Sequence, residues 1–230
     1  MASLGKLAAT VAHELNNPLA GILNYAKLVE RDLREGVEGP GGEAEISRFL
    51  SLIQKESSRC GDIVRNLLVF ARRSGGELAL HALSEVLDRS LMIVRHRMEL
   101  GNVALERRAL EGDDRVVCDA GQIEQALVAL CVNAIEAMEP GGVLTLELRP
   151  GEDSVEIAVS DTGCGIAPEA LPHVFEPFYT TKEGGSGAGL GLAVAYGIVE
   201  RHAGRIEVGS EPGVGTTFRL TLPRKQESTP

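Results

Sequence analysis

The stretch "VLTLELRPGEDSVEIAVSD", residues 143–161, alternates apolar and polar residues on both sides of a turn from Pro150 to Asp153. Such alternation is typical of two antiparallel strands with one buried face. The second strand ends at Asp161, and a glycine-rich irregular stretch, 162–189, follows it. This hairpin predicts a sheet at the centre of the C-terminal part of the chain.

Outward from the hairpin, strand patterns alternate with helix patterns. Strands are expected near 77–82, 103–108 and 115–118 and in a closing hairpin at 204–223, and helices over 84–100, 120–138 and 190–202. This order predicts an α+β sandwich, a layer of helices on a mixed sheet, as a domain over 77–224. Residues 225–230 are expected to be a disordered tail.

The first 73 residues carry a different pattern. Apolar residues repeat by threes and fours from Leu4 to about Arg34 and again from Ile46 to Arg72, and the glycine-rich stretch "EGVEGPGG" at 35–42 separates the two runs. The pattern predicts an α-helical hairpin over 1–73, followed by a linker at 74–76. Because two helices give each other only one face, we expect a homodimer with a four-helix bundle.

Composition excludes several classes of protein. The formal charge is −10, and Lys and Arg form no stripe, so a nucleic-acid surface is not expected. The four cysteines show no C-x-x-C spacing, which argues against a zinc site or a disulfide framework. The longest apolar run, "ALVALCV" at 126–132, is far short of the roughly 20 residues of a membrane span. We expect a cytoplasmic segment of a longer protein, whose upstream part could attach to a membrane.

The stretch "AHELNNPL", residues 12–19, places an unusual histidine on the first helix. At about 100° per residue, His13 lies about 200° from Val11 and therefore points away from the apolar face, with Asn17 one turn further on the same side. An exposed imidazole beside the carboxylate of Glu14 is suited to nucleophilic attack. A histidine with no role is the alternative. Pro18 argues against it, because a proline inside a helix lowers helix stability by about 3 kcal/mol and such a cost needs a compensating function.

Two glycine-rich motifs are suited to binding a nucleotide. "DTGCGI" at 161–166 ends a strand with Asp161, which could accept a hydrogen bond from an exocyclic amine while the glycines approach a flat ring. "GGSGAGLGL" at 184–192 opens into a helix whose N–H groups suit phosphate oxygens, with the cation of Lys182 just before it. An ordinary turn and a plain linker are the alternatives.

Asn133 is a polar residue on the largely apolar helix over 120–138. Its amide oxygen is a suitable ligand for Mg²⁺, which usually keeps several waters and bridges to phosphates. A side chain that only meets solvent is the alternative.

Together the motifs resemble the catalytic core of sensor histidine kinases of two-component systems, from about Leu4 to Pro223. "AHELNNPLAGILNY" resembles the H box, "QALVALCVNAIEAM" the N box, "DTGCGI" the first glycine box, "FEPFYTTK" at 175–182 the F box and "GAGLGLAVAYGIVERHAGRI" the second glycine box. The joined "HELNNPL" and "NAIEAM" look most like the nitrogen-regulation subgroup. The resemblance implies a dimerisation and histidine phosphotransfer domain followed by a GHKL-type ATP-binding domain.

The resemblance also implies roles for individual residues. His13 would be phosphorylated by ATP, with Glu14 as the general base. Asn17 would position the water in the reverse reaction, dephosphorylation of the partner response regulator. Asn133 would ligate Mg²⁺, and Asp161 would read the adenine amine, supported by Thr217. The base pocket and the lid over the phosphates would be formed by Gly163, Gly165, Ile166, Thr181, Lys182, Gly187, Ala188, Gly189 and Leu190, and Phe175 and Phe178 would anchor the lid.

The implied activity is ATP- and Mg²⁺-dependent autophosphorylation, then transfer to an aspartate of a response regulator. The chain departs from many relatives at Ala129, where an asparagine is common, and at Glu136, where a Lys or Arg is common. A GHKL-type ATPase clamp that phosphorylates no histidine is the main alternative, and a dimeric scaffold of weak activity is another.

Overall fold

The computed structural model describes residues 2–35, 40–71, 78–109, 112–181 and 189–225. The chain divides into two compact units: a mainly helical unit of the first 72 residues together with residues 180–190, and an α/β unit formed by the rest. The predicted linker at 74–76 lies outside the described residues, as does the predicted tail beyond residue 225. None of the described helices combines the length and the apolar character that a membrane span requires.

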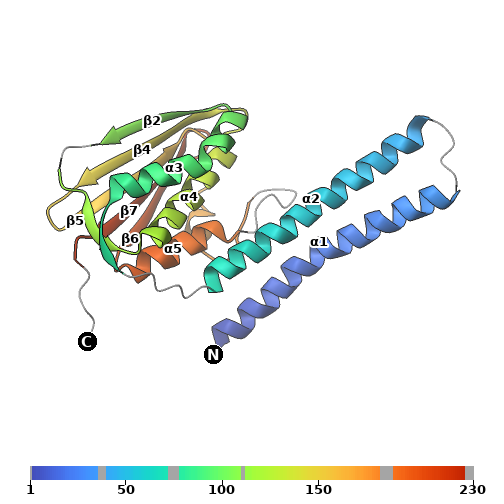
Figure 1. The fold of residues 1–230 in the computed structure, drawn as a ribbon, viewed down its shortest axis with the longest axis horizontal. Coiled ribbons are helices and arrows are strands. Elements are labelled where there is room, and N and C mark those ends of the chain that lie inside the picture. The colour runs from blue at the N-terminus through green and yellow to red at the C-terminus, as the bar shows by residue number, and fades with distance from the viewer. Residues whose placement is uncertain (1, 36–39, 72–77, 110–111, 182–188, 226–230) are drawn as a thin grey trace. The chain divides into compact units, whose positions relative to one another are not determined.

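The helical unit is the predicted hairpin, formed by α1 (Ala2–Glu35) and α2 (Pro40–Ala71) (Figure 1). The rings of Tyr25 on α1 and Phe49 on α2 stack with their centroids 6.1 Å apart. Helix α2 begins earlier than predicted, inside the stretch 35–42 that was expected to be a break. Proline is favoured in the first turn of a helix, where its missing N–H has no partner to lose, and this explains the start at Pro40.

The α/β unit is built on a five-stranded mixed sheet, as predicted. Its order is β2 (Val103–Ala109), β4 (Gly142–Pro150), β5 (Ser154–Asp161), β7 (Gly215–Pro223) and β6 (Arg205–Glu211). Strands β2 and β4 are parallel, and the other neighbours are antiparallel. The predicted strands near 77–82 and 115–118 are β1 (Ala79–Ala82) and β3 (Arg115–Cys118), and they form a separate antiparallel pair that the sequence did not predict.

Three helices cover one face of the five-stranded sheet (Figure 1). They are α3 (Leu83–Leu100), α4 (Ala120–Ala137) and α5 (Gly191–Arg201), and a short 3₁₀ helix, η1 (Leu171–His173), follows β5 in the chain. The sheet residues on the covered face alternate with polar residues on the other face, and those of the three central strands are Leu144, Leu146, Leu148, Val155, Ile157, Val159, Phe218, Leu220 and Leu222. This two-layer arrangement is the predicted α+β sandwich.

Helix α4 is held at its start by side chains from two directions. The carboxylate of Asp119 accepts hydrogen bonds from the N–H groups of Gly121 at 3.0 Å and Gln122 at 3.1 Å. Such a cap typically stabilises a helix by about 1 kcal/mol. The N–H of Asp119 itself donates to Nε2 of His202, just beyond α5, at 3.0 Å, and Nδ1 of His202 donates to the carbonyl of Ile198 at 2.8 Å. His202 therefore joins the end of α5 to the start of α4.

The guanidinium of Arg224 joins three segments of the α/β unit through backbone carbonyls. It donates to Gly151 at 2.8 Å and Glu152 at 3.0 Å in the β4–β5 turn, to Arg115 at 3.1 Å at the start of β3, and to Asp113. We expect Arg224→Ala to lower the free energy of unfolding by about 1–3 kcal/mol, because several charge-assisted hydrogen bonds are lost together. Urea unfolding of the purified chain measures this change.

Arg205→Ala is the matched control for Arg224→Ala. Arg205 pairs only with Glu207 on the same strand among the contacts of the described residues, at 2.7 Å, and its side chain is 75% exposed. Exposed pairs of this kind contribute about 0–1 kcal/mol. A loss no larger in Arg224→Ala than in Arg205→Ala would contradict the role given to Arg224.

Candidate functional site

Asp161 ends strand β5 on the helix-covered face of the sheet. It is 7% exposed and pairs in register with Thr216 of β7. Its carboxylate accepts hydrogen bonds from the N–H groups of Gly163, at 2.8 Å, and of Thr216. Burial raises the pKa of Asp161, and the two hydrogen bonds offset part of that rise. The result is a carboxylate held rigidly at the edge of the core.

The glycines after Asp161 allow the chain to run against two other backbones. A Cβ on Gly163 would lie 2.5 Å from the carbonyl oxygen of Ala137, at the end of α4. Gly165 has a φ of +70°, and its Cβ would lie 2.2 Å from the carbonyl oxygen of Glu211, at the end of β6. Only glycine fits both positions. The segment 161–166 is therefore anchored between α4 and β6 with Asp161 at its base.

Asn133 lies on α4, one turn after Ala129 on the same side of the helix. A Cβ on Gly191, the first residue of α5, would lie 3.8 Å from Cβ of Ala129, so this side of α4 approaches the start of α5. The side chain of Asn133 is half-buried and makes no hydrogen bond with another residue that the structure describes. Its amide oxygen therefore remains available to a metal ion near a helix N-terminus suited to phosphate.

Phe175 ties the segment that precedes the glycine-rich stretch to the α/β unit. Its ring lies 5.3 Å from that of Tyr196 on α5 and 6.1 Å, edge to face, from that of the buried Phe218 on β7. Phe178 has a φ of +68°, which is rare for a bulky residue. Tyr179 N–H donates to the carbonyl of Glu176 at 3.2 Å.

Several predicted lid residues lie beyond this anchor. Thr181 is exposed, Gly189 has a φ of +62° and Leu190 is buried. Lys182, Gly187 and Ala188 lie outside the described residues.

The residues predicted to carry the phosphoryl chemistry lie on α1. His13 and Glu14 are part of its continuous helix, but their side chains are outside the described part of the chain. Asn17 is exposed and, one turn after His13, shares its side of the helix. Pro18 stands within the helix, as the sequence predicted.

Thr217, which was expected to support Asp161, lies on the other face of the sheet. It pairs in register with Ser160 and donates its hydroxyl to Ser160 at 2.9 Å. Sequence reasoning missed two residues that do lie near Asp161, Thr216 and Ser210. Thr216 is the cross-strand neighbour of Asp161, and Ser210 of β6 is the neighbour of Thr216. Strand alternation could have found Thr216, because it is in phase with the apolar Phe218.

An open hollow of about 400 Å³ lies at this end of β5, β7 and β6. Its lining includes Asp161, Ser210 and Thr216 of the helix-covered face together with Gly209, Thr217 and Arg219 of the other face. The hollow is therefore not confined to the face of the sheet on which Asp161 lies.

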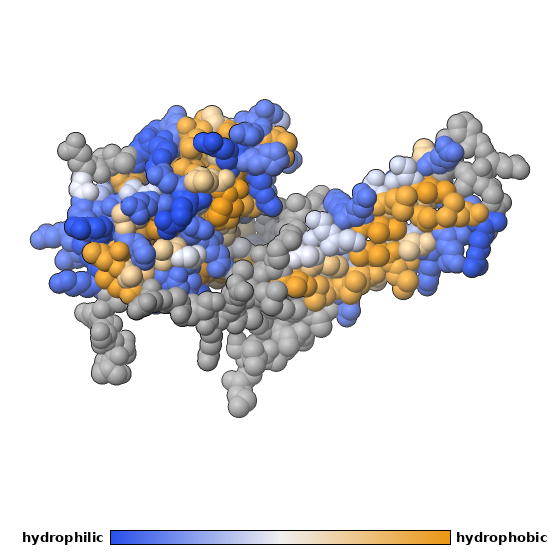
Figure 2. Space-filling view, viewed as in Figure 1, coloured by the Kyte–Doolittle hydropathy of each residue, from blue (hydrophilic) through white to orange (hydrophobic). Residues whose placement is uncertain are grey.

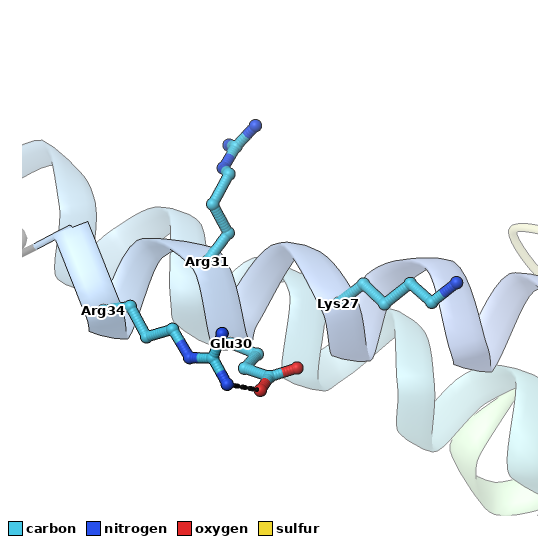
Figure 3. Close-up of a pocket in the computed structure, with 4 residues that line it drawn as sticks. All are labelled: Lys27, Glu30, Arg31 and Arg34. Carbon is cyan, nitrogen blue, oxygen red and sulfur yellow. Dashed lines mark ion pairs between the residues drawn. The ribbon is translucent and has the colours of Figure 1, made fainter.

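A second hollow lies along α1, around Lys27, Glu30, Arg31 and Arg34 (Figure 3). Arg34 pairs with Glu30 at 2.6 Å, while Figure 3 shows Arg31 pointing away from this pair. The side chains of Arg34 and Glu30 are 78% and 60% exposed, and such pairs contribute about 0–1 kcal/mol. The hollow is a solvated helix surface and holds none of the predicted site residues.

Comparison with known families matches both units. Residues 3–76 match the His kinase A (phospho-acceptor) domain, and residues 118–226 match the histidine kinase-, DNA gyrase B- and HSP90-like ATPases. The first match contains His13, Glu14 and Asn17, and the second contains Asn133 and Asp161.

Individual relatives match along nearly the whole chain. The sensor protein FixL of Bradyrhizobium diazoefficiens is 34% identical over 231 residues, which cover 99% of this chain and 45% of FixL. The sensor histidine kinase ZraS of Escherichia coli is 37% identical over 226 residues, covering 97% of this chain and 46% of ZraS. The chain therefore spans less than half the length of these two relatives.

A solved structure shares the fold. The crystal structure of the histidine kinase ThkA in complex with the response regulator protein TrrA superimposes with a TM-score of 0.75 and 26% identity, covering 96% of this chain and 62% of that one. In this chain the phosphoacceptor domain precedes the ATPase domain. The chain belongs to the sensor histidine kinases of two-component systems, of which it holds the catalytic core.

Proposed function

We propose that this chain autophosphorylates His13 with ATP and Mg²⁺ and then passes the phosphoryl group to an aspartate of a response regulator. The observation that carries the proposal is that one chain holds a phosphoacceptor helix with an exposed Asn17 beside the His13 position and a separate unit with the buried carboxylate of Asp161. The domain boundaries at 73 and 77 and the nitrogen-regulation subgroup remain predictions.

In the proposed reaction, a ring nitrogen of His13 attacks the γ-phosphorus of ATP. The bond from that phosphorus to the bridging oxygen breaks, and ADP leaves. Glu14 takes the proton from the other ring nitrogen and so stabilises the imidazole as the phosphoramidate forms. Catalysis of such transfers is mostly positioning and charge neutralisation.

The α/β unit would hold the nucleotide. Asp161 would accept the adenine amine, and Gly163, Gly165 and Ile166 would line the base pocket. Asn133 would hold Mg²⁺, which would supply charge neutralisation at the phosphates. Thr181, Lys182 and residues 187–190 would close over the phosphates. The half-buried start of α5 at Gly191 lies close to the side of α4 that carries Asn133, which supports this arrangement.

A homodimer would bury the apolar side chains that the hairpin leaves exposed. Leu19, Leu23, Leu33, Leu50 and Val64 are between 42% and 66% exposed. Figure 2 shows apolar side chains gathered along the hairpin. Burying a leucine-sized side chain contributes roughly 1.5–3 kcal/mol, so these residues can together hold two hairpins in a four-helix bundle.

A receiver domain is the proposed acceptor of the phosphoryl group. ThkA, which shares the fold over both units, is described in complex with a response regulator protein. The phosphoacceptor helix would present His13 to the acceptor aspartate after ADP formation.

Incubation with γ-labelled ATP and Mg²⁺ tests the proposal. A kinase will acquire a label that is stable to alkali and labile to acid, as a phosphoramidate is. ATP hydrolysis without labelling would favour an ATPase clamp, since the fold of residues 118–226 is shared with DNA gyrase B and HSP90. A chain that shows neither labelling nor ATP hydrolysis would favour a scaffold.

Asn17→Ala is expected to keep autophosphorylation but to lower dephosphorylation of the regulator by about tenfold to a hundredfold. The proposed role of Asn17 is to position water, and misplacing a reactant by about 1 Å costs up to about 100-fold. The measurement is the decay of phosphorylated cognate receiver domain with and without the variant. Asn16→Ala is the control, because Asn16 is also exposed but lies about 100° around the helix. Equal effects of the two variants would contradict the role.

A further inference from the structure

The hydroxyl of Ser210 joins three segments at the edge of the site. Its Oγ accepts a hydrogen bond from the N–H of Ile166 at 2.8 Å, in the glycine-rich segment after β5. It donates to the carbonyl oxygen of Gly215 at 2.9 Å, and a third hydrogen bond of 2.9 Å joins it to Oγ1 of Thr216. The single side chain of Ser210 therefore connects the base-pocket segment to strand β7.

Counting protons decides which way the hydroxyl of Thr216 points. A serine hydroxyl has one proton to donate and two lone pairs to accept with. The proton of Ser210 goes to the carbonyl of Gly215, so Ser210 must accept from both Ile166 and Thr216. The hydroxyl proton of Thr216 is thereby directed to Ser210, so Thr216 Oγ1 can take part in a further hydrogen bond only as an acceptor.

Asp161, Thr216 and Ser210 lie in one row across three neighbouring strands. Asp161 pairs with Thr216, and Thr216 pairs with Ser210, all on the helix-covered face. The carboxylate of Asp161 is an acceptor, and the network makes its neighbour Thr216 an acceptor as well. Two adjacent acceptors fit an amino group, which has two N–H donors, and oppose a carbonyl oxygen, which has only lone pairs.

We propose that Ser210 is a specificity-determining positioning residue, which holds Thr216 as an acceptor beside Asp161 so that the site selects 6-aminopurine over 6-oxopurine nucleotides. This inference rests on the proposed binding of ATP at Asp161. Ser210 acts through Thr216 and touches no reacting atom. A buried acceptor that faces a carbonyl oxygen stays unpaired, and such mismatches carry most of the discrimination between polar ligands.

Equilibrium binding of ATP and inosine triphosphate, measured by titration calorimetry, tests the proposal without needing kinase activity. Ser210→Ala releases the hydroxyl of Thr216 to rotate and donate to the 6-oxo group. We expect the ratio of the dissociation constants, inosine triphosphate to ATP, to fall about five- to tenfold relative to wild type, the effect of one neutral hydrogen bond. An unchanged ratio would overturn the proposal.

Ser160→Ala is the matched control. Ser160 also takes part in a cross-strand hydroxyl pair of 2.9 Å, with Thr217, but on the opposite face of the same sheet. Ser160→Ala removes the same hydroxyl oxygen and one cross-strand hydrogen bond of the β5–β7 pair, and we expect it to leave the ratio unchanged. A fall in Ser160→Ala equal to that in Ser210→Ala would mean that general loosening of the sheet causes the effect, which would overturn the proposal.

A double-mutant cycle with Thr216→Val separates positioning of Thr216 from support of Ile166. Valine keeps the shape of threonine but has no hydroxyl to orient. If Ser210 acts through Thr216, Ser210→Ala will not lower the ratio further in the Thr216→Val background. A further fall of the same size would show that Ser210 acts elsewhere and would overturn the proposal.

Nucleotide binding by the wild-type chain separates the role of Ser210 from the existence of the nucleotide site. A wild-type chain that binds neither nucleotide would refute the nucleotide site itself. A wild-type chain that prefers ATP, with the same preference in Ser210→Ala, would refute only the role of Ser210. Unfolding midpoints of all variants, measured in parallel, verify that each one is folded at the titration temperature.

Discussion

His13→Ala is expected to abolish incorporation of the γ-phosphoryl group of ATP, a loss of about 10³-fold or more. Removing the nucleophile of a group-transfer enzyme removes the step itself, and losses of up to about 10⁶-fold are known for such residues. The helix should persist, because alanine has the highest helix propensity and His13 lies within the 34 residues of α1. The measurement is acid-labile label on the purified chain with γ-labelled ATP and Mg²⁺.

Two controls make the result for His13→Ala specific. ATP affinity should stay the same, because the nucleotide is expected to bind the α/β unit. His96→Ala should label normally, because His96 is an exposed residue of α3 whose side chain is 80% exposed. Label that persists in His13→Ala would show that another residue is the phosphoacceptor, and the assigned role of His13 would be wrong.

Asp161→Asn is expected to weaken ATP binding by about tenfold to a hundredfold. The carboxylate is held by two backbone N–H donors, and it is expected to accept a third hydrogen bond, from the adenine amine. An amide of the same shape presents an NH₂ group to one of these donors. Hydrogen bonds to a charged group contribute about 1.5–3 kcal/mol each, which sets the size of the expected loss.

Titration calorimetry with ATP measures this loss, and Asp88→Asn is its control. Asp88 is an exposed residue of α3 that pairs with Arg107 at 2.7 Å, and its side chain is 55% exposed. We expect Asp88→Asn to bind ATP as the wild type does. Wild-type affinity in Asp161→Asn would contradict the assignment of Asp161 as the group that reads the adenine.

The same carboxylate makes ATP affinity depend on pH. The ionised form of Asp161 is the one that accepts the amine, and burial raises its pKa above the ordinary value of 3.8. A group with a raised pKa takes up its proton at a higher pH than usual. As the solution is acidified, ATP affinity should therefore begin to fall at a higher pH than it would if Asp161 had an ordinary aspartate pKa. Titrations at several pH values measure the pH at which this fall begins.

Local patterns in the sequence predicted most of the elements. The alternation around Pro150 to Asp153 predicted β4 and β5, and the three–four repeat predicted α1 and α2. Asp161 was placed correctly at the end of a strand, because a run of alternating residues that stops at a polar residue before glycines marks a strand end. Each of these features depends on neighbours within a few residues along the chain.

Sequence reasoning failed where pairing between distant segments decides. Thr216 and Thr217 are adjacent, and both are hydroxyl residues, so only the register of β7 against β5 shows that Thr216 is the one beside Asp161. Ser210 was not singled out, because its partners Ile166 and Gly215 lie on other segments. The start of α2 at Pro40 was missed for a local reason, since glycine was given more weight than the proline at the first helical position.

By itself, the amino-acid sequence determined the two kinds of unit, the helix that carries His13 and the strand end that carries Asp161. These follow from periodicity and from the backbone preferences of glycine and proline, which act over one or two turns. Only the tertiary structure decided which hydroxyls stand in the row with Asp161 and how the proton of Ser210 is used. Hydrogen-bond direction depends on every partner of a group at once, and those partners come from strands and loops that are tens of residues apart.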